Sequence, residues 1–385
     1  MPDYKVDVEL VRRWTYSGCM TLLPDGRSAE FVSESGLAEP SGLVSINERA
    51  SASVVLRWLR EGKDLLWEGD WEKGSELLKD LRKSLQRERG DNVEESALER
   101  WREQRGAIRE QGELLGGILV VLEKDGEVRL RNAPDVRRAV ELAWGLEAGL
   151  RVVALSSLLG ALSAAEWTRK GIEVPGLNGK LKPRFGVFSP TRRAYVDLLL
   201  HLDAKGKTVL DVGCGTGVLG FVLLQQGAVS AVGTDLDERS VVCAIDNAAR
   251  LGMAKRYRAQ LADLFPVGER FDCVVFNAPW VPEVPRTRLD RAVFDEEGQT
   301  LKRFVEGLSK CLTEGGVGAI LVSDLPERLG LRQAGYVEEL AAAEGLQVRL
   351  VADVPAVHKR AQDVRDPLHE VRKDERVRIL VLGVG

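Results

Sequence analysis

Apolar residues in the first part of the chain recur at the spacing of amphipathic helices. Three such stripes lie between residues 50 and 115. Their members are Val55, Trp58 and Leu59, then Leu77, Leu78, Leu81 and Leu85, and finally Leu98, Trp101, Ile108 and Leu115. We therefore expect the helices of this region to pack as a small bundle.

Two short apolar runs follow, and together they predict a β-hairpin. Residues 118–122 and 128–130 flank a turn at Asp125-Gly126. Helical spacing returns over 135–143 and 154–170, and the Gly- and Pro-punctuated stretch after it predicts a domain boundary near residue 178. Residues 1–178 are thus expected to form a mainly helical, substrate-recognising domain with a β-hairpin, and residues 179–385 a second domain.

The pattern changes to alternating strands and helices after residue 207. Strands are expected at 208–212, 230–234, 257–260, 272–276, 316–323, 347–353 and 376–383, and helices at 217–226, 238–250, 300–313 and 331–344. This alternation predicts an α/β fold with a seven-stranded, mainly parallel Rossmann-like sheet covered on both faces. The last two strands, joined by residues 354–375, should form an antiparallel hairpin at one edge.

Composition narrows the class of protein. Hydrophobic residues make up 44% of the 385 residues and charged residues 30%, as in ordinary globular proteins. The five cysteines are scattered and there are only three histidines, so neither a disulfide framework nor a metal site is expected. Without a signal peptide or a long apolar run, a cytoplasmic protein with no membrane contact is predicted. The net charge is −4, without the basic excess typical of a nucleic-acid-binding domain.

The most informative motif follows the first strand of the alternating region. It comprises Asp211, Val212, Gly213, Cys214, Gly215, Thr216 and Gly217. Glycines at alternate positions let the backbone turn tightly and approach a ligand closely. A strand ending in such a turn delivers it to the carboxyl edge of the sheet, where α/β proteins bind ligands. This arrangement suits the amino-acid end of S-adenosyl-L-methionine, whose ammonium group Asp211 is expected to hold.

Two later carboxylates complete the predicted donor pocket. Asp235 ends the next strand, where it can accept hydrogen bonds from ribose hydroxyls. Asp263 follows the third strand and is expected to accept from the adenine amino group, with Leu236 and Leu264 on either side of the ring.

A dinucleotide site is the main competitor, because residues 215–220 match G-x-G-x-x-G. Asp211 argues against it, since a carboxylate two residues before the first glycine is poorly placed beside a pyrophosphate. Cys214 is interpreted as a small turn residue without a catalytic role.

The fourth predicted strand ends in Asn277-Ala278-Pro279-Trp280. An amide or aromatic amine is a weak nucleophile, because its lone pair is delocalised. The Asn277 side-chain oxygen and the Ala278 carbonyl can accept its two N–H groups and so turn the lone pair toward the methyl group. Pro279 stiffens the turn and Trp280 offers a flat face for stacking. Catalysis would rest on positioning and hydrogen bonding.

These motifs resemble a known family. Asn277-Ala278-Pro279-Trp280 is similar to the Asn-Pro-Pro-Tyr/Phe motif of class I N-methyltransferases, with Ala and Trp as departures. Gly186 to Arg192 resembles the segment before the donor pocket in the "methyltransferase small domain" group. That group includes release-factor glutamine methyltransferases and rRNA guanine-N2 methyltransferases. The resemblance covers about residues 184–325, and the substrate-binding candidates in and beside it are Phe188, Thr191, Arg192, Trp280 and Arg286.

The sequence therefore predicts an S-adenosylmethionine-dependent N-methyltransferase acting on a planar amide or amino nitrogen. A protein or peptide acceptor is favoured, because the front half lacks a basic footprint. An RNA base and a small-molecule amine remain alternative acceptors, and a non-catalytic donor-binding module is a further alternative. The oligomeric state stays open.

Overall fold

The computed structural model describes residues 19–33, 36–87, 96–146, 149–191, 194–357 and 359–384. Within them the chain forms two compact units. The first comprises residues up to 95 together with 102–166, and the second comprises 96–101 and 167 onward. The predicted domain boundary at residue 178 thus lies within the second unit.

The first unit contains a six-stranded mixed sheet in the order β1-β2-β6-β5-β4-β3. Its strands are β1 (Met20–Leu22), β2 (Ser28–Val32), β3 (Leu43–Ile46), β4 (Asp64–Trp67), β5 (Ile118–Leu122) and β6 (Arg151–Ala154). The associated helices are α2 (Ala52–Arg60), α3 (Trp71–Arg87), α4 (Ala97–Gly116), α5 (Arg137–Trp144) and α6 (Leu155–Lys170), of which α4 and α6 continue into the second unit. The predicted helices are present, but a helical bundle is the wrong architecture.

The predicted hairpin is also wrong. Residues 128–130 form no strand, and β5 instead pairs parallel with β4 and antiparallel with β6. Four of its five residues are buried. A continuous apolar run of this kind needs neighbours on both sides, which a hairpin partner alone cannot supply.

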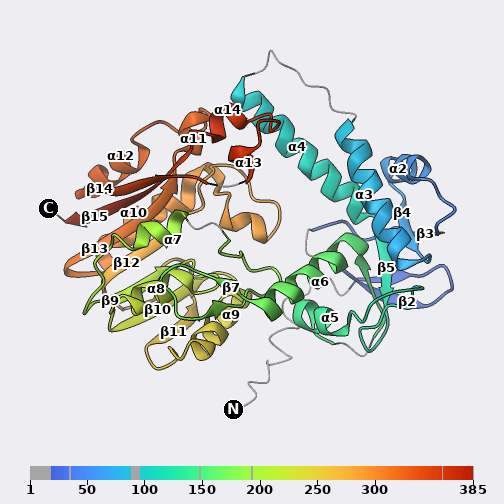
Figure 1. Cartoon of the computed structure of the whole chain (residues 1–385), viewed down its shortest axis with the longest axis horizontal. Helices are drawn as coiled ribbons and strands as arrows, with labels where there is room; N and C mark the ends of the chain where they lie inside the picture. The colour runs from blue at the N-terminus through green and yellow to red at the C-terminus, as the bar shows by residue number, and fades with distance from the viewer. Residues whose placement is uncertain are drawn as a thin grey trace. The chain divides into compact units, whose positions relative to one another are not determined.

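The second unit is built on a seven-stranded sheet in the order β11-β10-β9-β12-β13-β15-β14 (Figure 1). The strands are β9 (Thr208–Val212), β10 (Ser230–Asp235), β11 (Tyr257–Leu261), β12 (Phe271–Asn277), β13 (Leu312–Ser323), β14 (Leu346–Pro355) and β15 (Arg376–Val384). The first five run parallel, whereas β15 is antiparallel to both β13 and β14. The predicted Rossmann-like sheet and its antiparallel edge hairpin are confirmed.

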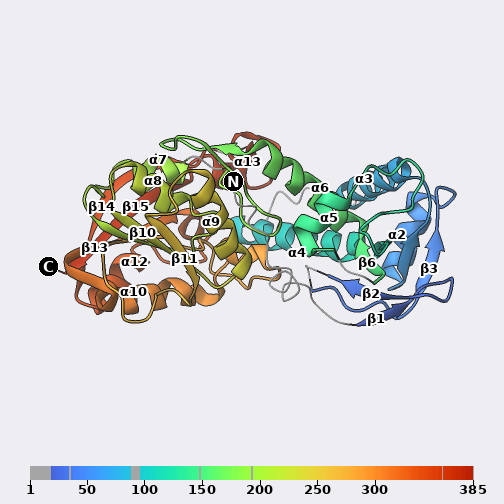
Figure 2. The same cartoon turned by 90° about the horizontal axis from the view of Figure 1, so that it is seen from below.

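Helices cover both faces of this sheet (Figure 2). One face packs against α7 (Ala194–Leu199), α8 (Val218–Gln225) and α9 (Glu238–Arg250), and the other against α10 (Gln299–Cys311) and α12 (Tyr336–Ala343). Alternate residues of the central strands point to opposite cores: Val209 and Cys273 to one, Leu210 and Val274 to the other. A sheet buried on both faces leaves its strand ends for ligands.

Short elements complete the second unit. They are β7 (Ile172–Glu173), β8 (Lys180–Leu181), α11 (Leu325–Arg328), α13 (Lys359–Gln362), α14 (His369–Arg372) and the 3-10 turns η1 (Leu289–Ala292) and η2 (Glu296–Gly298). Among the described residues, no helix combines the length and the hydropathy needed to cross a bilayer.

Candidate functional site

A cavity of about 540 Å³ opens at the carboxyl ends of β9, β10 and β12. This volume lies within the usual range for small-molecule sites. The predicted site residues on its wall are Phe188, Gly213, Cys214, Gly215, Thr216, Asp235, Leu236, Leu264, Asn277 and Pro279. The predicted residues Asp211, Gly217, Asp263, Ala278, Trp280, Thr191 and Arg286 do not line it, and Arg192 lies outside the described residues.

The glycine turn has the backbone that only glycine adopts readily. Gly213, Gly215 and Gly217 have φ values of 63°, 52° and 83°. Gly217 is the N-cap of α8, and a Cβ there would lie 2.5 Å from Cζ of Phe221. The turn is held from β10, because the Cys214 amide donates to the Thr234 carbonyl at 2.8 Å.

Asp235 joins the glycine turn to the next loop. Its carboxylate accepts from the Gly215 amide at 3.0 Å and from the Asp237 amide at 2.9 Å. Burial raises the pKa of this carboxyl above its usual value. A carboxylate has about four acceptor positions, so it can also receive hydroxyl donors from the cavity.

Asp211 lies beneath the turn instead of on the cavity wall. It is fully buried, and one carboxyl oxygen accepts from the Gly220 amide at 2.9 Å. The other oxygen is buried and has no hydrogen-bond partner among the described residues. Burial raises the pKa of Asp211 to about 8. Asp211 therefore supports the turn without lining the cavity, and its expected contact with an ammonium group stays a prediction.

Cys214 occupies the turn as a small buried side chain. Burial raises the pKa of its thiol well above the usual range, so the nucleophilic thiolate is disfavoured.

Asp263 points away from the predicted adenine position. Its carboxylate pairs with Arg303 of α10 at 2.6 Å on an exposed surface. Leu264 has a φ of 64°, and its carbonyl accepts from the Thr234 hydroxyl at 2.6 Å. This left-handed turn brings Leu264 to the cavity wall while Asp263 stays on the surface, so the predicted adenine contact of Asp263 is not supported.

Asn277 ends β12 and lies on the cavity wall. Its side-chain oxygen is buried and accepts no hydrogen bond from any residue that the structure describes. An unpaired buried acceptor is costly unless a ligand or a water molecule supplies its hydrogen bond. β12 pairs with β9, so Asn277 and the glycine turn belong to adjacent strand ends, as predicted.

Trp280 does not stack over this cavity. Its indole N–H donates to the Leu321 carbonyl at 3.3 Å, and its ring packs against the apolar cores. It instead lines a second cavity, which shares Pro279, Asp295 and Glu297 with the first. The Trp280 side chain therefore lies on the wall of a neighbouring cavity.

Most residues on the far wall of the first cavity were not predicted from the sequence. This wall is formed by Pro285, Arg288, Leu289, Arg291, Ala292, Phe294 and Glu297. Arg288 and Arg291 carry a sequence signal as part of an arginine-rich run, but the predicted contact of Arg286 is not seen. The remaining residues come from an irregular segment without periodicity. Asp295 fixes its end by accepting from the Thr300 and Leu301 amides at the start of α10.

Trp101 supports this wall from the start of α4. It is buried with Val281, Phe294 and Leu368, and its indole N–H donates to Glu283 at 3.0 Å. The Arg372 guanidinium lies over the ring, 5.7 Å from its centroid. Trp101 therefore packs in the second unit, and not with the stripe on which its spacing places it.

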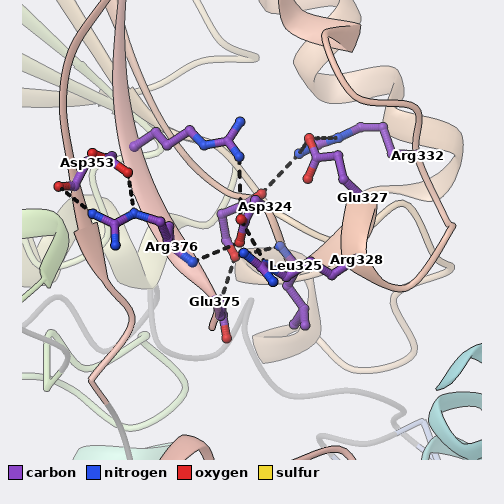
Figure 3. Close-up of polar contacts among 10 residues, drawn as sticks. Asp324, Leu325, Glu327, Arg328, Arg332, Asp353, Glu375 and Arg376 are labelled. Carbon is purple, nitrogen blue, oxygen red and sulfur yellow. Dashed lines mark hydrogen bonds and ion pairs between the residues drawn. The ribbon is translucent and has the colours of Figure 1, made fainter. Parts of the chain in front are cut away.

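A buried polar cluster centred on Asp324 fixes the chain after β13 (Figure 3). Asp324 accepts from the Arg376 amide and the Arg328 side chain, both at 2.8 Å. The Ser323 hydroxyl donates to Glu375 at 2.7 Å, while Arg332 donates to the Ser323 carbonyl at 3.1 Å. The cluster thereby holds residues 325–332, which lead into the second cavity.

Comparison with known proteins adds sequence relatives. Residues 189–278 match the family "Ribosomal protein L11 methyltransferase (PrmA)". A Methanocaldococcus jannaschii protein with the name "Putative protein N5-glutamine methyltransferase" is 33% identical over 182 residues, which is 44% of this chain and 90% of that protein. A ribosomal protein L11 methyltransferase of Histophilus somni is 39% identical over 88 residues, which is 23% of this chain and only 30% of that enzyme.

Solved structures with a similar arrangement include an L11 methylase of Lactobacillus delbrueckii and a TehB-like SAM-dependent methyltransferase of Corynebacterium glutamicum. The first is 20% identical, covers 50% of this chain and 77% of its own, and has a TM-score of 0.35. The second is 18% identical, covers 50% and 87%, and has a TM-score of 0.33.

A seven-stranded sheet with one reversed strand and a glycine turn at its carboxyl edge is the class I methyltransferase arrangement. Through its C-terminal half, the chain belongs to the methyltransferase small-domain group of S-adenosylmethionine-dependent methyltransferases.

Proposed function

We propose that the enzyme methylates a side-chain amide nitrogen of a protein, with glutamine as the acceptor residue. The observation that carries this proposal is the buried side-chain oxygen of Asn277 on the wall of the donor cavity, which has no hydrogen-bond partner within the described parts of the chain. An acceptor amide N–H would satisfy it. The archaeal relative named as a glutamine methyltransferase, which aligns over 90% of its length, supports the same acceptor.

The residues on the cavity wall fit S-adenosylmethionine as the methyl donor. The glycine turn gives close backbone approach, and Asp235, at the end of the next strand, lies on the cavity wall where a ribose hydroxyl can reach its carboxylate. Leu236 and Leu264 supply apolar wall on the side expected for the adenine ring. When bound, S-adenosylmethionine supplies an electrophilic methyl group on a sulfonium.

Asn277 would act by orientation. Its side-chain oxygen accepts one N–H of the acceptor amide and so aligns the nitrogen lone pair with the methyl carbon. With the donor bound, transfer would replace its S–CH₃ bond with an N–CH₃ bond on the acceptor, and the nitrogen would give one proton to water. As positive charge develops on the nitrogen, the hydrogen bond from its N–H to the Asn277 oxygen strengthens. This hydrogen bond therefore stabilises the transition state more than the ground state.

Labelled methyl transfer tests the acceptor. The full chain is incubated with cell extract and methyl-labelled donor, and the products are treated separately with protease and nuclease. We expect protease-sensitive label that is released as methylamine by acid hydrolysis, because an N-methyl amide is cleaved there whereas an N-methyl-lysine is not. A parallel reaction with Asn277→Ala provides the matched control.

An RNA base is the second candidate acceptor, since Arg288 and Arg291 on the far wall could attract phosphate. Label that is sensitive to nuclease and resistant to protease would replace the protein proposal with this one.

A further inference from the structure

The second cavity has a volume of about 490 Å³ and adjoins the donor cavity. Pro279, Asp295 and Glu297 line both spaces. Trp280, three residues beyond Asn277, lies on its wall. Three residues of chain span at most about 11 Å, so the second cavity lies within reach of a polypeptide whose amide nitrogen contacts Asn277.

The wall of this cavity combines apolar surface with negative charge. Trp280, Leu331 and Tyr336 supply aromatic and aliphatic faces. Glu297 and Glu339 are exposed carboxylates, and within the described ranges of the chain neither is engaged in a hydrogen bond or an ion pair. These two groups are therefore free to receive a ligand.

The other charged groups on the wall are already engaged. Asp295 accepts two amides at the start of α10. Arg332, with 6% of its side chain exposed, donates to Glu327 at 3.0 Å and to the Ser323 carbonyl. Its positive charge is thus balanced by Glu327, and the charge presented to a ligand is that of Glu297 and Glu339.

We propose that this cavity is a subsite for a lysine or arginine side chain of the substrate polypeptide. The proposal rests on the protein-amide function above, and it places the basic residue within about three positions of the methylated one. The aliphatic stem would lie along the Leu331 and Tyr336 surface, with the cation near Trp280 and the two carboxylates.

Charge complementarity favours this occupant over RNA. A phosphate backbone would be repelled by Glu297 and Glu339, whereas a lysine or arginine head gains from both carboxylates and from the aromatic face. The Asp324 cluster holds Arg332, one of the residues on the cavity wall, through its hydrogen bonds to the Ser323 carbonyl and Glu327 (Figure 3).

Charge reversal at Glu339 tests the subsite. The probes are synthetic peptides centred on glutamine, with lysine, alanine or glutamate at each flanking position. For the unmodified enzyme, lysine at one flanking position should raise kcat/KM at least about fivefold over glutamate. Glu339→Lys should abolish or invert that preference and leave the affinity for S-adenosylhomocysteine unchanged.

The matched control is Glu338→Lys. Glu338 is the preceding exposed residue of α12 and does not line the cavity, so the same charge change there should leave the flanking preference intact. Equal behaviour of the two variants, or no flanking preference in the unmodified enzyme, would overturn the subsite.

A binding measurement separates failure of the subsite from failure of the proposed acceptor. N-acetylarginine amide is titrated against the full chain by ligand-observed NMR, which needs no turnover. Binding that is lost in Glu339→Lys and kept in Glu338→Lys supports the subsite even if glutamine peptides are not methylated. Binding that is absent, or equal in both variants, refutes it even if label enters protein.

Discussion

The two sides of the donor cavity are built differently. The donor side consists of consecutive residues at the ends of β9 and β10, and backbone hydrogen bonds hold it in shape. The acceptor side is assembled from residues distant in sequence, as the Trp101–Glu283 bond between residues 182 positions apart shows. The first is therefore a local motif and the second a product of tertiary packing, and substitutions on each side should fail in different ways.

The largest effect is expected on catalysis, from a substitution of Asn277, which lies between the donor side and the acceptor side. Asn277→Ala removes the oxygen proposed to orient the acceptor, so kcat should fall about 100- to 1000-fold, the usual cost of one transition-state hydrogen bond. Because the alanine side chain leaves the glycine turn and Asp235 intact, the Kd for S-adenosylhomocysteine should change less than about threefold. Wild-type turnover in the variant would disprove the orientation role, and a calorimetric titration checks the donor.

On the donor side, replacing a glycine of the turn should strain the backbone and lower the free energy of unfolding. Gly217→Ala places a Cβ 2.5 Å from the buried Phe221 ring at a φ of 83°, and we expect a loss of about 3 kcal/mol in the free energy of unfolding. Gly215→Ala is the matched variant. It has a similarly positive φ, but its Cβ approaches no atom closer than 4.0 Å, so about 1 kcal/mol should be lost.

Urea denaturation compares the two glycine variants. Similar losses would show that steric contact with Phe221 contributes little and that the turn is limited by backbone conformation alone.

The same contrast explains what the sequence could predict. Strand periodicity places all seven strands of the second sheet, and the glycine turn, Asp235 and Asn277 follow because they end those strands. Side-chain direction just beyond a strand is not encoded so simply. Asp263 and Leu264 are neighbours, yet the left-handed turn at Leu264 leaves the carboxylate to pair with Arg303 of a later helix.

Non-local packing accounts for the other missed features. The irregular segment 281–298 takes its form from contacts with Trp101 and Leu368, which no local pattern reveals. The sheet of the first unit was missed because its strands are short and β2 pairs with the distant β6. Trp101 has helical spacing like any core residue, so its partner could not be deduced from periodicity.

On the acceptor side, removing one long-range bond should have a moderate effect. Trp101→Phe keeps an aromatic ring but leaves Glu283 without its indole N–H, and we expect about 2 kcal/mol of destabilisation. Donor binding should raise the unfolding temperature of the second unit, which identifies its transition. The destabilisation by Trp101→Phe should appear in this same transition, because Trp101 packs in the second unit. Trp167→Phe, at a site 47% exposed, is the control and should change stability by less than about 0.5 kcal/mol.

A pH dependence of stability on the donor side, produced by Asp211, should be about as large as the Trp101→Phe loss. The folded-state pKa of Asp211, about 8, exceeds the unfolded value of 3.8, so the native state keeps a proton that the unfolded chain releases. That contribution is complete below pH 3.8 and is lost as the pH rises toward 8, at a rate of at most about 1.4 kcal/mol per pH unit.

Asp211→Asn removes this titration and retains an oxygen that can accept from the Gly220 amide. Between pH 6 and pH 7.5, the unmodified enzyme should lose stability relative to the variant in urea denaturation. Donor affinity in the variant should stay within about threefold, because Asp211 supports the turn without lining the cavity. Parallel stability profiles would mean that the carboxyl is already ionised in the folded chain. A large loss of donor affinity would instead indicate that Asp211 contacts the donor directly. In that case the donor side would depend on a side chain as well as on the backbone, and the difference between the two sides of the cavity would be smaller.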